Sequence, residues 1–355
     1  MPRNKHKKAN EKVLEVLGKT LKGNEILIIG VSGGPDSVFL LNCLLEFKEQ
    51  TAPKTTSLKI IVAHVNHMLR GHEAEEDLEF VKSLAKKHNL EFEKTEVDIN
   101  SLAETTKSSI EESGREIRYK FFLKLFKKYK ADFLATAHHS DDSLETILLN
   151  FIRGASLKGL CGIKLISTQK TGLTLFRPLL CVSKQEIIEY LQDKNIKFRI
   201  DQTNFDTKIP RNFLRHEIIP QLKTLNPNLS QTILKNSESF MEIQNFLNEK
   251  AKVWIQENSN INNARSQSSF DLKSFNLLPR SLQKEIIILI YKNKAGTTKD
   301  IENTHLNEVL SIINKNIGGK KKRLGKYTVE IKQGTFIFNT DCLAKNSRSG
   351  HITNS

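Results

Sequence analysis

The stretch "LIIGVSGGPDSVFLL", residues 27–41, runs from an apolar segment of strand length through a glycine-rich turn into a segment of helical character. Gly33 and Gly34 allow the backbone to turn tightly and point its N–H groups at a ligand, while the next helix directs its positive dipole end to the same place. Pro35 suits the first turn of that helix because its φ angle is already helical. The stretch predicts a phosphate-binding turn, with contacts expected from Ser32, Gly33, Gly34, Pro35, Asp36 and Ser37.

Asp36 is an unexpected residue at a site for an anion. Its carboxylate would repel a polyphosphate at short range unless a divalent cation lay between them, so it predicts Mg²⁺ bound together with a nucleotide. An alternative needs no ligand, because an Asp near a helix N-terminus is favourable by ~0.3 to 1 kcal/mol on its own. The turn has neither the Gly-Lys-Ser/Thr of a Walker A loop nor the G-x-G-x-x-G pattern.

The sequence around this turn predicts the α/β class, with a doubly wound, mostly parallel sheet. Runs of strand length occur at residues 25–32, 58–65, 90–97 and 131–138, and helical periodicity occurs at 37–48, 73–88 and 110–129. In the last helix, Ile117, Phe121 and Leu125 form one apolar stripe. Alternating strands and helices form a parallel sheet covered on both faces, and ligands bind beyond the carboxyl ends of its strands.

A second polar cluster, "TAHHSDDSLETILLNFIRG" (136–154), follows the last of these strands. Helical spacing brings His138, Asp142 and Glu145 to one side, where they could bind a second metal ion, polarise a substrate or orient a nucleophile. Acidic residues also help a helix to begin, so capping alone could explain one of the aspartates.

The same cluster predicts how its helix is placed. Ser140 is expected to cap a helix that begins at Asp141. The face expected in the core carries Ile147, Leu148 and Phe151.

Arginines are expected beside a phosphoryl group in transfer. "GREIRYKFF" (114–122) offers Arg115 and Arg118, of which we choose Arg118. A solvated surface position is the ordinary alternative for either of them. A weaker signal in "HVNHMLRG" (64–71) suggests adenine or ribose contacts from His64, Asn66 and Arg70.

The C-terminal part of the chain is expected to be mainly helical from residue 183, where "SKQE" is a capping-box pattern. Residues 228–258 predict one long helix, 257–269 a polar linker, and 270–345 a small unit with helices at 279–293 and 303–315 and a hairpin at 327–338. The expected domains are a catalytic domain at 1–222, a helical linker with a small substrate-binding domain at 223–345, and a disordered tail at 346–355.

Composition favours a polyanionic partner. Lysine and arginine exceed aspartate and glutamate by 15, a basic excess typical of nucleic-acid binding, although solubilising charge is the alternative. The four cysteines form no C-x-x-C pair, which argues against a zinc ribbon or a disulfide framework. No apolar run approaches the ~18 residues that span a bilayer, and the N-terminus is too polar for a signal peptide, so a cytoplasmic location is expected.

The run S-G-G-P-D-S after a buried strand resembles the S-G-G-x-D-S signature of the PP-loop, or N-type, ATP pyrophosphatases. That resemblance implies cleavage of ATP between its α and β phosphates and transfer of AMP to a substrate oxygen. It does not identify the substrate.

Further segments are similar to the tRNA(Ile)-lysidine synthetase family: "HVNHMLRG", "GREIRYKFF", the cluster at 136–154, "FRPLL" (176–180) and "DQTNFDTKIPRNFLRHEIIPQL" (201–222). The resemblance implies that ATP adenylates the C2 oxygen of the wobble cytidine in a CAU-anticodon tRNA(Ile), and that free L-lysine then displaces AMP to give lysidine. Part of the family carries a further C-terminal domain, which this chain is expected to lack. A homodimer is also compatible with the resemblance.

Roles follow from the resemblance position by position. Asp36 and Asp142 would hold Mg²⁺; Arg118, His138 and Asp142 would serve activation and transfer, with Glu145 in support. Residues implied to face the tRNA or the activated base are Arg211, Asn212 and Arg215. The basic run "GGKKKRLGKY" (318–327) adds candidate phosphate contacts at Lys320, Lys321, Lys322 and Arg323, although any basic turn would look the same.

The sequence is also compatible with other functions. A tRNA thiolase could use the same ATP activation, but it needs nucleophilic cysteines or an iron–sulfur ligand set, and only Cys161 and Cys181 could pair here. A glutamine-fed amidating synthetase would need a glutaminase segment that is not apparent. A non-catalytic RNA-binding module is the alternative from another class.

Overall fold

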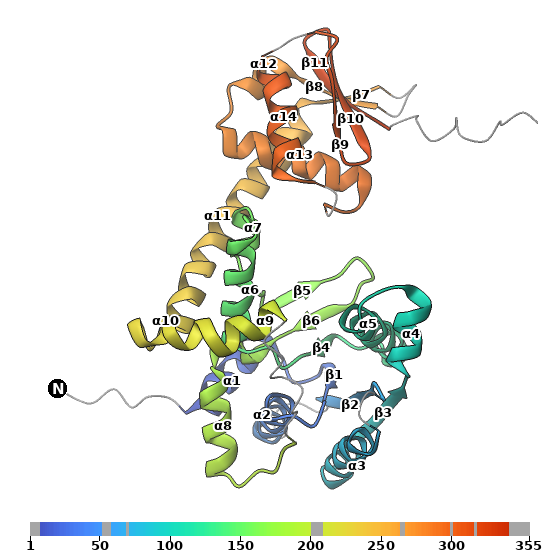
Figure 1. The fold of residues 1–355 in the computed structure, drawn as a ribbon, viewed down its shortest axis with the longest axis vertical. Helices are drawn as coiled ribbons and strands as arrows, with labels where there is room; N and C mark the ends of the chain where they lie inside the picture. Colours follow the sequence, from blue (N-terminus) through green and yellow to red (C-terminus); the bar gives the residue numbers. More distant parts are fainter. Residues whose placement is uncertain are drawn as a thin grey trace, which may run out of the picture. The chain divides into compact units, whose positions relative to one another are not determined.

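The computed structural model describes residues 8–51, 58–68, 71–199, 209–262, 267–298, 301–315 and 318–340. The chain forms two compact units, Met1–Glu238 and Ser239–Ser355 (Figure 1). The domain boundary expected at residue 222 stays a prediction, and the tail expected at 346–355 lies outside the described residues.

The first unit is built on a six-stranded sheet with the order β3-β2-β1-β4-β6-β5. Its strands are β1 (Ile26–Gly30), β2 (Lys59–Asn66), β3 (Glu91–Glu96), β4 (Phe133–Ala135), β5 (Ile166–Thr168) and β6 (Thr174–Phe176). Among the described strands of this sheet, only β5 and β6 pair antiparallel. The doubly wound α/β prediction is therefore confirmed, and the strand order reverses between β1 and β4, where such sheets bind their ligands.

Both faces of this sheet are buried, which explains its continuous apolar strands. Leu27 and Ile29 of β1 pack into one core with helices α1 (Ala9–Thr20), α2 (Pro35–Thr51), α3 (His72–Lys87) and α8 (Lys184–Asp193). Ile28 points to the opposite face, into a core with α5 (Ile110–Tyr129). Figure 1 shows these helices on the two sides of the sheet. The short α4 (Ile99–Thr106) precedes α5 and packs against it.

The buried face of α5 differs slightly from the expected stripe. Phe122 and Leu125 are buried, whereas Phe121 is only partly so and Ile117 is half-buried. The helix is rotated because Phe122 must fill the space above Gly30, where a Cβ would lie 3.0 Å from its ring.

The helix after β4 corrects two expectations. It is α6 (Ser140–Ile152), and its N-cap is His139, whose N–H donates to Asp142. Ser140 is fully buried and its hydroxyl has no hydrogen-bond partner among the described residues, so it is not the cap. Phe151 is 69% exposed instead of facing the core, because Leu144 and Ile147 form the buried apolar face.

The remaining elements of this unit are short apart from the last helix. They are α7 (Leu157–Leu160), a 3₁₀ turn η1 (Pro178–Cys181), α9 (Pro210–Phe213), a π-helical turn η3 (Leu214–Ile218), α10 (Ile219–Leu225) and α11 (Leu229–Asn258), which continues into the second unit. The capping box at the start of α8 is confirmed, because Ser183 and Glu186 each accept the other's backbone N–H.

The second unit places helices against a five-stranded antiparallel sheet with the order β7-β8-β11-β10-β9. Its elements are β7 (Ser259–Asn262), β8 (Gln267–Asp271), α12 (Leu272–Asn276), α13 (Arg280–Ala295), α14 (Asn303–Asn314), β9 (Lys321–Leu324), β10 (Tyr327–Lys332) and β11 (Thr335–Thr340). Both predicted helices and the hairpin are confirmed. The linker prediction for 257–269 is wrong, because β7 and β8 lie in this range and pair antiparallel.

No helix in the described part of the chain is both long and apolar enough to cross a membrane.

Candidate active site

A cavity of about 410 Å³ opens at the carboxyl ends of β1 and β4, where the strand order reverses. Residues from the turn after β1, from β2, from α5 and from the segment after β4 line it. Seven expected site residues are among them: Ser32, Gly34, Asp36, Ser37, Arg118, His138 and Asp142. The fold thus brings the two polar clusters, about a hundred residues apart in sequence, to one cavity.

The turn after β1 is held in shape by its own hydroxyls. Ser37 Oγ donates to the carbonyl of Gly34 at 2.9 Å, and it lies 3.3 Å from Ser32 Oγ. Gly33 has a φ angle of +90°, which L side chains rarely adopt. Gly33 and Pro35 do not line the cavity. They therefore contribute to the backbone shape of the turn and do not face the space of the ligand.

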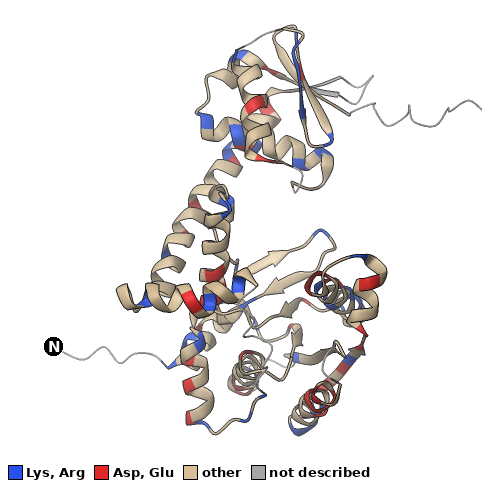
Figure 2. Cartoon of the chain, in the orientation of Figure 1, with Lys and Arg blue, Asp and Glu red and all other residues tan. Residues whose placement is uncertain are grey.

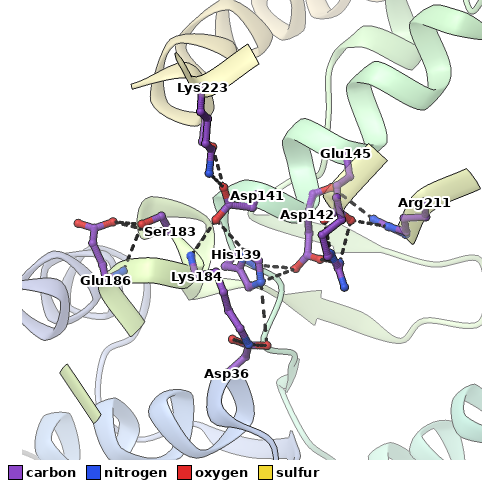
Figure 3. Close-up of polar contacts among 12 residues, drawn as sticks. Asp36, His139, Asp141, Asp142, Glu145, Ser183, Lys184, Glu186, Arg211 and Lys223 are labelled. Carbon is purple, nitrogen blue, oxygen red and sulfur yellow. Dashed lines mark hydrogen bonds and ion pairs between the residues drawn. The ribbon is translucent and has the colours of Figure 1, made fainter. Parts of the chain in front are cut away.

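Asp36 forms an ion pair that the sequence did not predict. The ammonium group of Lys184, the first residue of α8, donates to both carboxylate oxygens at 2.7 and 2.8 Å (Figure 3). The sequence signal was present in "SKQE", but the pattern was interpreted only as a helix start. In this structure a lysine therefore supplies the positive charge that Asp36 requires.

His139 lies among three carboxylates. Its Nε2 is 4.0 Å from Asp36 and 3.6 Å from Asp142, and its Nδ1 is 3.7 Å from Asp141. The side chain is buried, and Nδ1 has no hydrogen-bond partner among the described residues. Asp36 and Asp142 thus approach the same imidazole nitrogen, as Figure 3 shows. Burial alone would raise the pKa of Asp142, but His139, by its charge and its backbone N–H, holds that pKa below its ordinary value.

Asp142 and Asp36 are suited to share a magnesium ion with a nucleotide. Mg²⁺ is usually held by one or two carboxylates together with substrate phosphates, and both side chains line the cavity. No group of three or more His, Cys, Asp or Glu side chains in the described ranges could hold a metal ion alone. The residues therefore fit an ion that arrives with its phosphates.

His138 is a neutral group at neutral pH. Burial lowers its pKa to about 4, despite the opposing charge of Asp142. Its Nδ1 lies 3.0 Å from the hydroxyl of Thr136, which orients the ring. The imidazole can therefore exchange hydrogen bonds with a substrate without adding charge.

Arg118 faces the same cavity from α5. Its guanidinium donates to His67 Nε2 at 3.3 Å, and burial lowers its pKa. Burial, reinforced by the charge of Arg118, lowers the pKa of His67 to about 4, so the histidine is a neutral acceptor. His67 lines the cavity and was missed, although it belongs to the "HVNHMLRG" segment.

Two neighbours of His67 in sequence, His64 and Asn66, make hydrogen bonds to the backbone. His64 Nδ1 lies 2.8 Å from the carbonyl of Val31, and Asn66 accepts the N–H of Met68. Neither lines the cavity, and both make hydrogen bonds that hold the loops around it. Their contacts with adenine or ribose stay a prediction. Arg70 lies outside the described residues.

Glu145 holds the two expected arginines of α9 and η3. Its side chain is 1% exposed and accepts Arg211 Nε at 2.8 Å and Arg215 Nε at 2.6 Å. Arg215 also lies 3.5 Å from Asp142. Glu145 itself does not line the cavity, which agrees with a supporting role.

Helical spacing explains how both arginines reach one carboxylate, because Arg211 and Arg215 are four residues apart and lie on one face. Arg215 lies in the π-helical turn, which ends at Ile218, two residues before Pro220, a residue that has no N–H to continue an α-helical ladder. Asn212 follows Arg211 on α9.

Asp141 serves as a structural connector. It accepts Lys223 Nζ and Ser230 Oγ, both at 2.7 Å, and the backbone N–H of Lys184 at 2.8 Å. Burial opposes ionisation, but these donors lower the pKa of Asp141 to about 2. One carboxylate thus joins α6, α8, α10 and α11 behind the cavity.

In the second unit, the basic run at 320–323 enters β9. Lys321 lies 3.4 Å from Glu330, and Lys322 lies 2.9 Å from Glu308. Arg323 Nε donates to the carbonyl of Gly325. The charges of β9 appear in blue in Figure 2.

The described cysteines are poor nucleophiles. Burial raises the pKa of Cys181 to about 12 and raises the pKa values of Cys43 and Cys161. None of the three lines the cavity, and Cys342 lies outside the described residues. Thiols in this state stay protonated at neutral pH.

The chain is similar in sequence to a known family and to characterised proteins. Residues 5–222 match the family described as the PP-loop domain. The chain is 33% identical over 287 residues to the tRNA(Ile)-lysidine synthase of Geobacillus kaustophilus, covering 81% of this chain and 60% of that protein. It is 32% identical over 313 residues to the tRNA(Ile)-lysidine synthase of Caldanaerobacter subterraneus subsp. tengcongensis, covering 87% and 64%. The chain thus spans 60% to 64% of the length of these two relatives.

A solved structure shares the fold. The U34-tRNA thiolase NcsA from Methanococcus maripaludis, with its [4Fe-4S] cluster, superposes with a TM-score of 0.55 at 20% sequence identity, over 66% of this chain and 78% of that one. At this identity the likeness concerns the fold alone.

Proposed function

Because the chain belongs to the PP-loop family, we propose that it is an ATP-dependent tRNA-modifying ligase that makes lysidine in a CAU-anticodon tRNA(Ile). ATP would adenylate the C2 oxygen of the wobble cytidine, and free L-lysine would replace AMP. The observation that carries this proposal is one cavity lined by the glycine-rich turn, Asp36, Asp142, His138 and Arg118. Similarity to tRNA(Ile)-lysidine synthases over most of the chain supports the choice of substrate. The cytoplasm, where ATP and tRNA meet, is the expected location.

The first step forms a bond from the cytidine C2 oxygen to the α-phosphorus, while the bond from that phosphorus to the bridging oxygen breaks and pyrophosphate leaves. Magnesium held by Asp36 and Asp142 would neutralise charge on the phosphates. The turn from Ser32 to Ser37 offers hydroxyl and N–H donors to the phosphate chain. Arg118 donates toward charge that develops in the cavity.

In the second step the lysine nitrogen bonds to C2, and the C2–O bond breaks with AMP as the leaving group. The lysine ammonium must first lose a proton. His138 is neutral at neutral pH, so it is suited to hydrogen-bond the activated cytosine or the lysine nitrogen. Arg211 and Arg215, fixed by Glu145, would approach the activated base or its backbone phosphates.

A turnover assay with purified protein tests this function. Release of AMP from ATP should require both L-lysine and the CAU-anticodon tRNA(Ile), and this tRNA should gain the mass of lysine less one water. A CAU-anticodon initiator tRNA and ornithine in place of lysine serve as controls. Turnover that needs a sulfur donor instead of lysine would establish the thiolase alternative.

The state of the described cysteines favours the ligase over the thiolase. Sulfur transfer needs a thiolate or a cluster ligand near the activated base. The three described thiols are protonated and lie away from the cavity. A homodimer stays a prediction, which light scattering on the purified chain would test.

A further inference from the structure

Lys184 contacts a central residue of the candidate active site, yet the proposed function gives it no role. Its ammonium donates to both oxygens of Asp36, the carboxylate expected to hold magnesium. A carboxylate oxygen can accept a hydrogen bond and bind a metal ion at the same time, but an ammonium and a metal ion on one carboxylate repel each other. Arrival of a metal-bound nucleotide at Asp36 therefore favours a move of Lys184 to a new partner.

The backbone of Lys184 is fixed, whereas its side chain has room to move. The backbone N–H donates to the buried Asp141, and the preceding residue, Ser183, forms the capping box with Glu186. Glu186 is in turn paired with Lys12 of α1. By contrast, the Lys184 side chain is 42% exposed. A lysine is a compact charge on a flexible four-carbon stem, so the ammonium can leave Asp36 without any change in the helix.

The nearest new partner would be the ligand that displaces it. Asp36 lines the cavity next to the glycine-rich turn, and the Lys184 ammonium lies 2.7 Å from this carboxylate, so a short movement of the flexible side chain would bring the ammonium to a phosphate chain on that turn. Adenylation breaks the bond between the α-phosphorus and the bridging oxygen, and the electron pair leaves with pyrophosphate. A cation beside the leaving oxygens stabilises this charge.

We propose that Lys184 binds the β- and γ-phosphates of ATP, and that in the nucleotide-free protein Asp36 holds it ready. The inference rests on the proposed use of ATP, but it does not depend on which tRNA or amine the protein uses. Lys184 thus replaces, from a different element, the lysine that the turn lacks compared with a Walker A loop. Its ion pair with Asp36 keeps both charges compensated until the nucleotide arrives.

Ligand binding to the full chain tests the proposal without turnover. Isothermal titration calorimetry with ATP, pyrophosphate and AMP, in magnesium buffer and without tRNA or lysine, would compare wild type, Lys184→Met and Lys184→Arg. The Met variant should lose about tenfold to a hundredfold in affinity for ATP and pyrophosphate, the effect of one hydrogen bond to a charged group. Affinity for AMP, which has neither phosphate, should stay within about twofold. The Arg variant should retain most of the ATP affinity.

A matched control is the ion pair between Lys12 of α1 and Glu186 of α8. Lys12→Met removes this lysine–carboxylate pair and should leave all three affinities unchanged. Lys184→Gln makes the same comparison if the Met variant does not fold. Unchanged ATP affinity in the folded Lys184→Met or Lys184→Gln variant, or equal losses for ATP and AMP, would overturn the proposal. If ATP and AMP binding differ as expected but no lysidine forms, the proposed function fails and the role of Lys184 stands.

Discussion

Asp36 is the residue on which the proposed chemistry depends most directly. Its carboxylate lines the cavity and is neutralised by Lys184 in this structure. Asp36→Asn keeps the shape but removes the charge that would hold magnesium with the phosphates. We expect pyrophosphate release from ATP to fall by about 100- to 1000-fold, the usual cost of removing one charge-stabilising group from an active site.

A matched aspartate separates this effect from a general one. Asp132 accepts the N–H of Ile26 at the opposite, amino end of β1. Asp132→Asn should therefore leave pyrophosphate release near the wild-type rate. Full turnover of Asp36→Asn in a coupled pyrophosphate assay would refute the assignment of the cation site.

His138 gives the folded protein a pH dependence whose sign can be derived. The pKa of His138 is about 4 in the folded chain, whereas an exposed histidine in the unfolded chain has a pKa near 6.5. Between these two pH values the unfolded chain binds a proton that the folded chain does not. The free energy of unfolding should therefore fall as the pH decreases from about 6.5 to about 4. Urea unfolding of wild type and of His138→Asn across this range would measure it, and the variant should take up about one proton fewer on unfolding near pH 5. Equal slopes for the two proteins would contradict the burial of a neutral imidazole.

At the scale of elements, the turn between β1 and α2 depends on one of its two glycines. Gly33 has a φ angle of +90°, and an added Cβ would lie 3.4 Å from the ring of Phe80. For Gly34 the nearest atom would be Ser32 Oγ, also at 3.4 Å, but its φ angle lies outside the strained range. Gly33→Ala should reduce the free energy of unfolding by about 1 to 2 kcal/mol, whereas Gly34→Ala should change it by less than about 0.5 kcal/mol. Urea unfolding monitored by circular dichroism would distinguish the two variants. Equal losses of unfolding free energy would show that the space around the added Cβ, and not the backbone conformation, determines the cost.

The sequence predicted those elements whose signal is local. The strand, turn and helix around residues 27–41 and the long helix α11 each carry their own periodicity and turn residues, and both are present in the structure. The strands β7 and β8 were missed because their sequence is polar and their pairing with each other and with β11 is set by tertiary contacts. The rotation of α5 was missed for a similar reason, since Phe122 packs over Gly30 from a distant part of the chain.

In the candidate site, too, residues with a local sequence signal were predicted and long-range partners were not. Residues directly after β1 and β4 were predicted because the carboxyl ends of parallel strands converge on one edge. The partners that complete their charges were not, because Lys184 reaches Asp36 from 148 residues away and His67 reaches Arg118 from 51 residues away. A single sequence does not show which distant residues will form such side-chain pairs.

At the scale of the whole molecule, the excess of 15 positive charges is distributed unevenly over the elements. Helix α3 carries several glutamates, whereas β9 is largely lysine and arginine (Figure 2). Neutralising a nucleic-acid phosphate releases condensed counterions, so each lost contact lowers the slope of log affinity against log salt by about one. A basic strand that binds RNA should therefore contribute to the salt dependence of binding, and an acidic helix should not.

Lys320 and Lys321 provide the test of this surface. The Lys320 side chain is exposed and makes no hydrogen bond or ion pair with any residue that the structure describes, and Lys321 lies 3.4 Å from Glu330. The double variant Lys320→Ala, Lys321→Ala should weaken binding of tRNA and of unrelated RNA alike and reduce the salt slope by about one to two, measured by filter binding at several salt concentrations. The matched pair Lys82→Ala, Lys86→Ala on α3 removes the same charge from an acidic helix and should leave the slope unchanged. If both double variants lose the same slope, the effect belongs to net charge alone and β9 has no place in the RNA-binding surface.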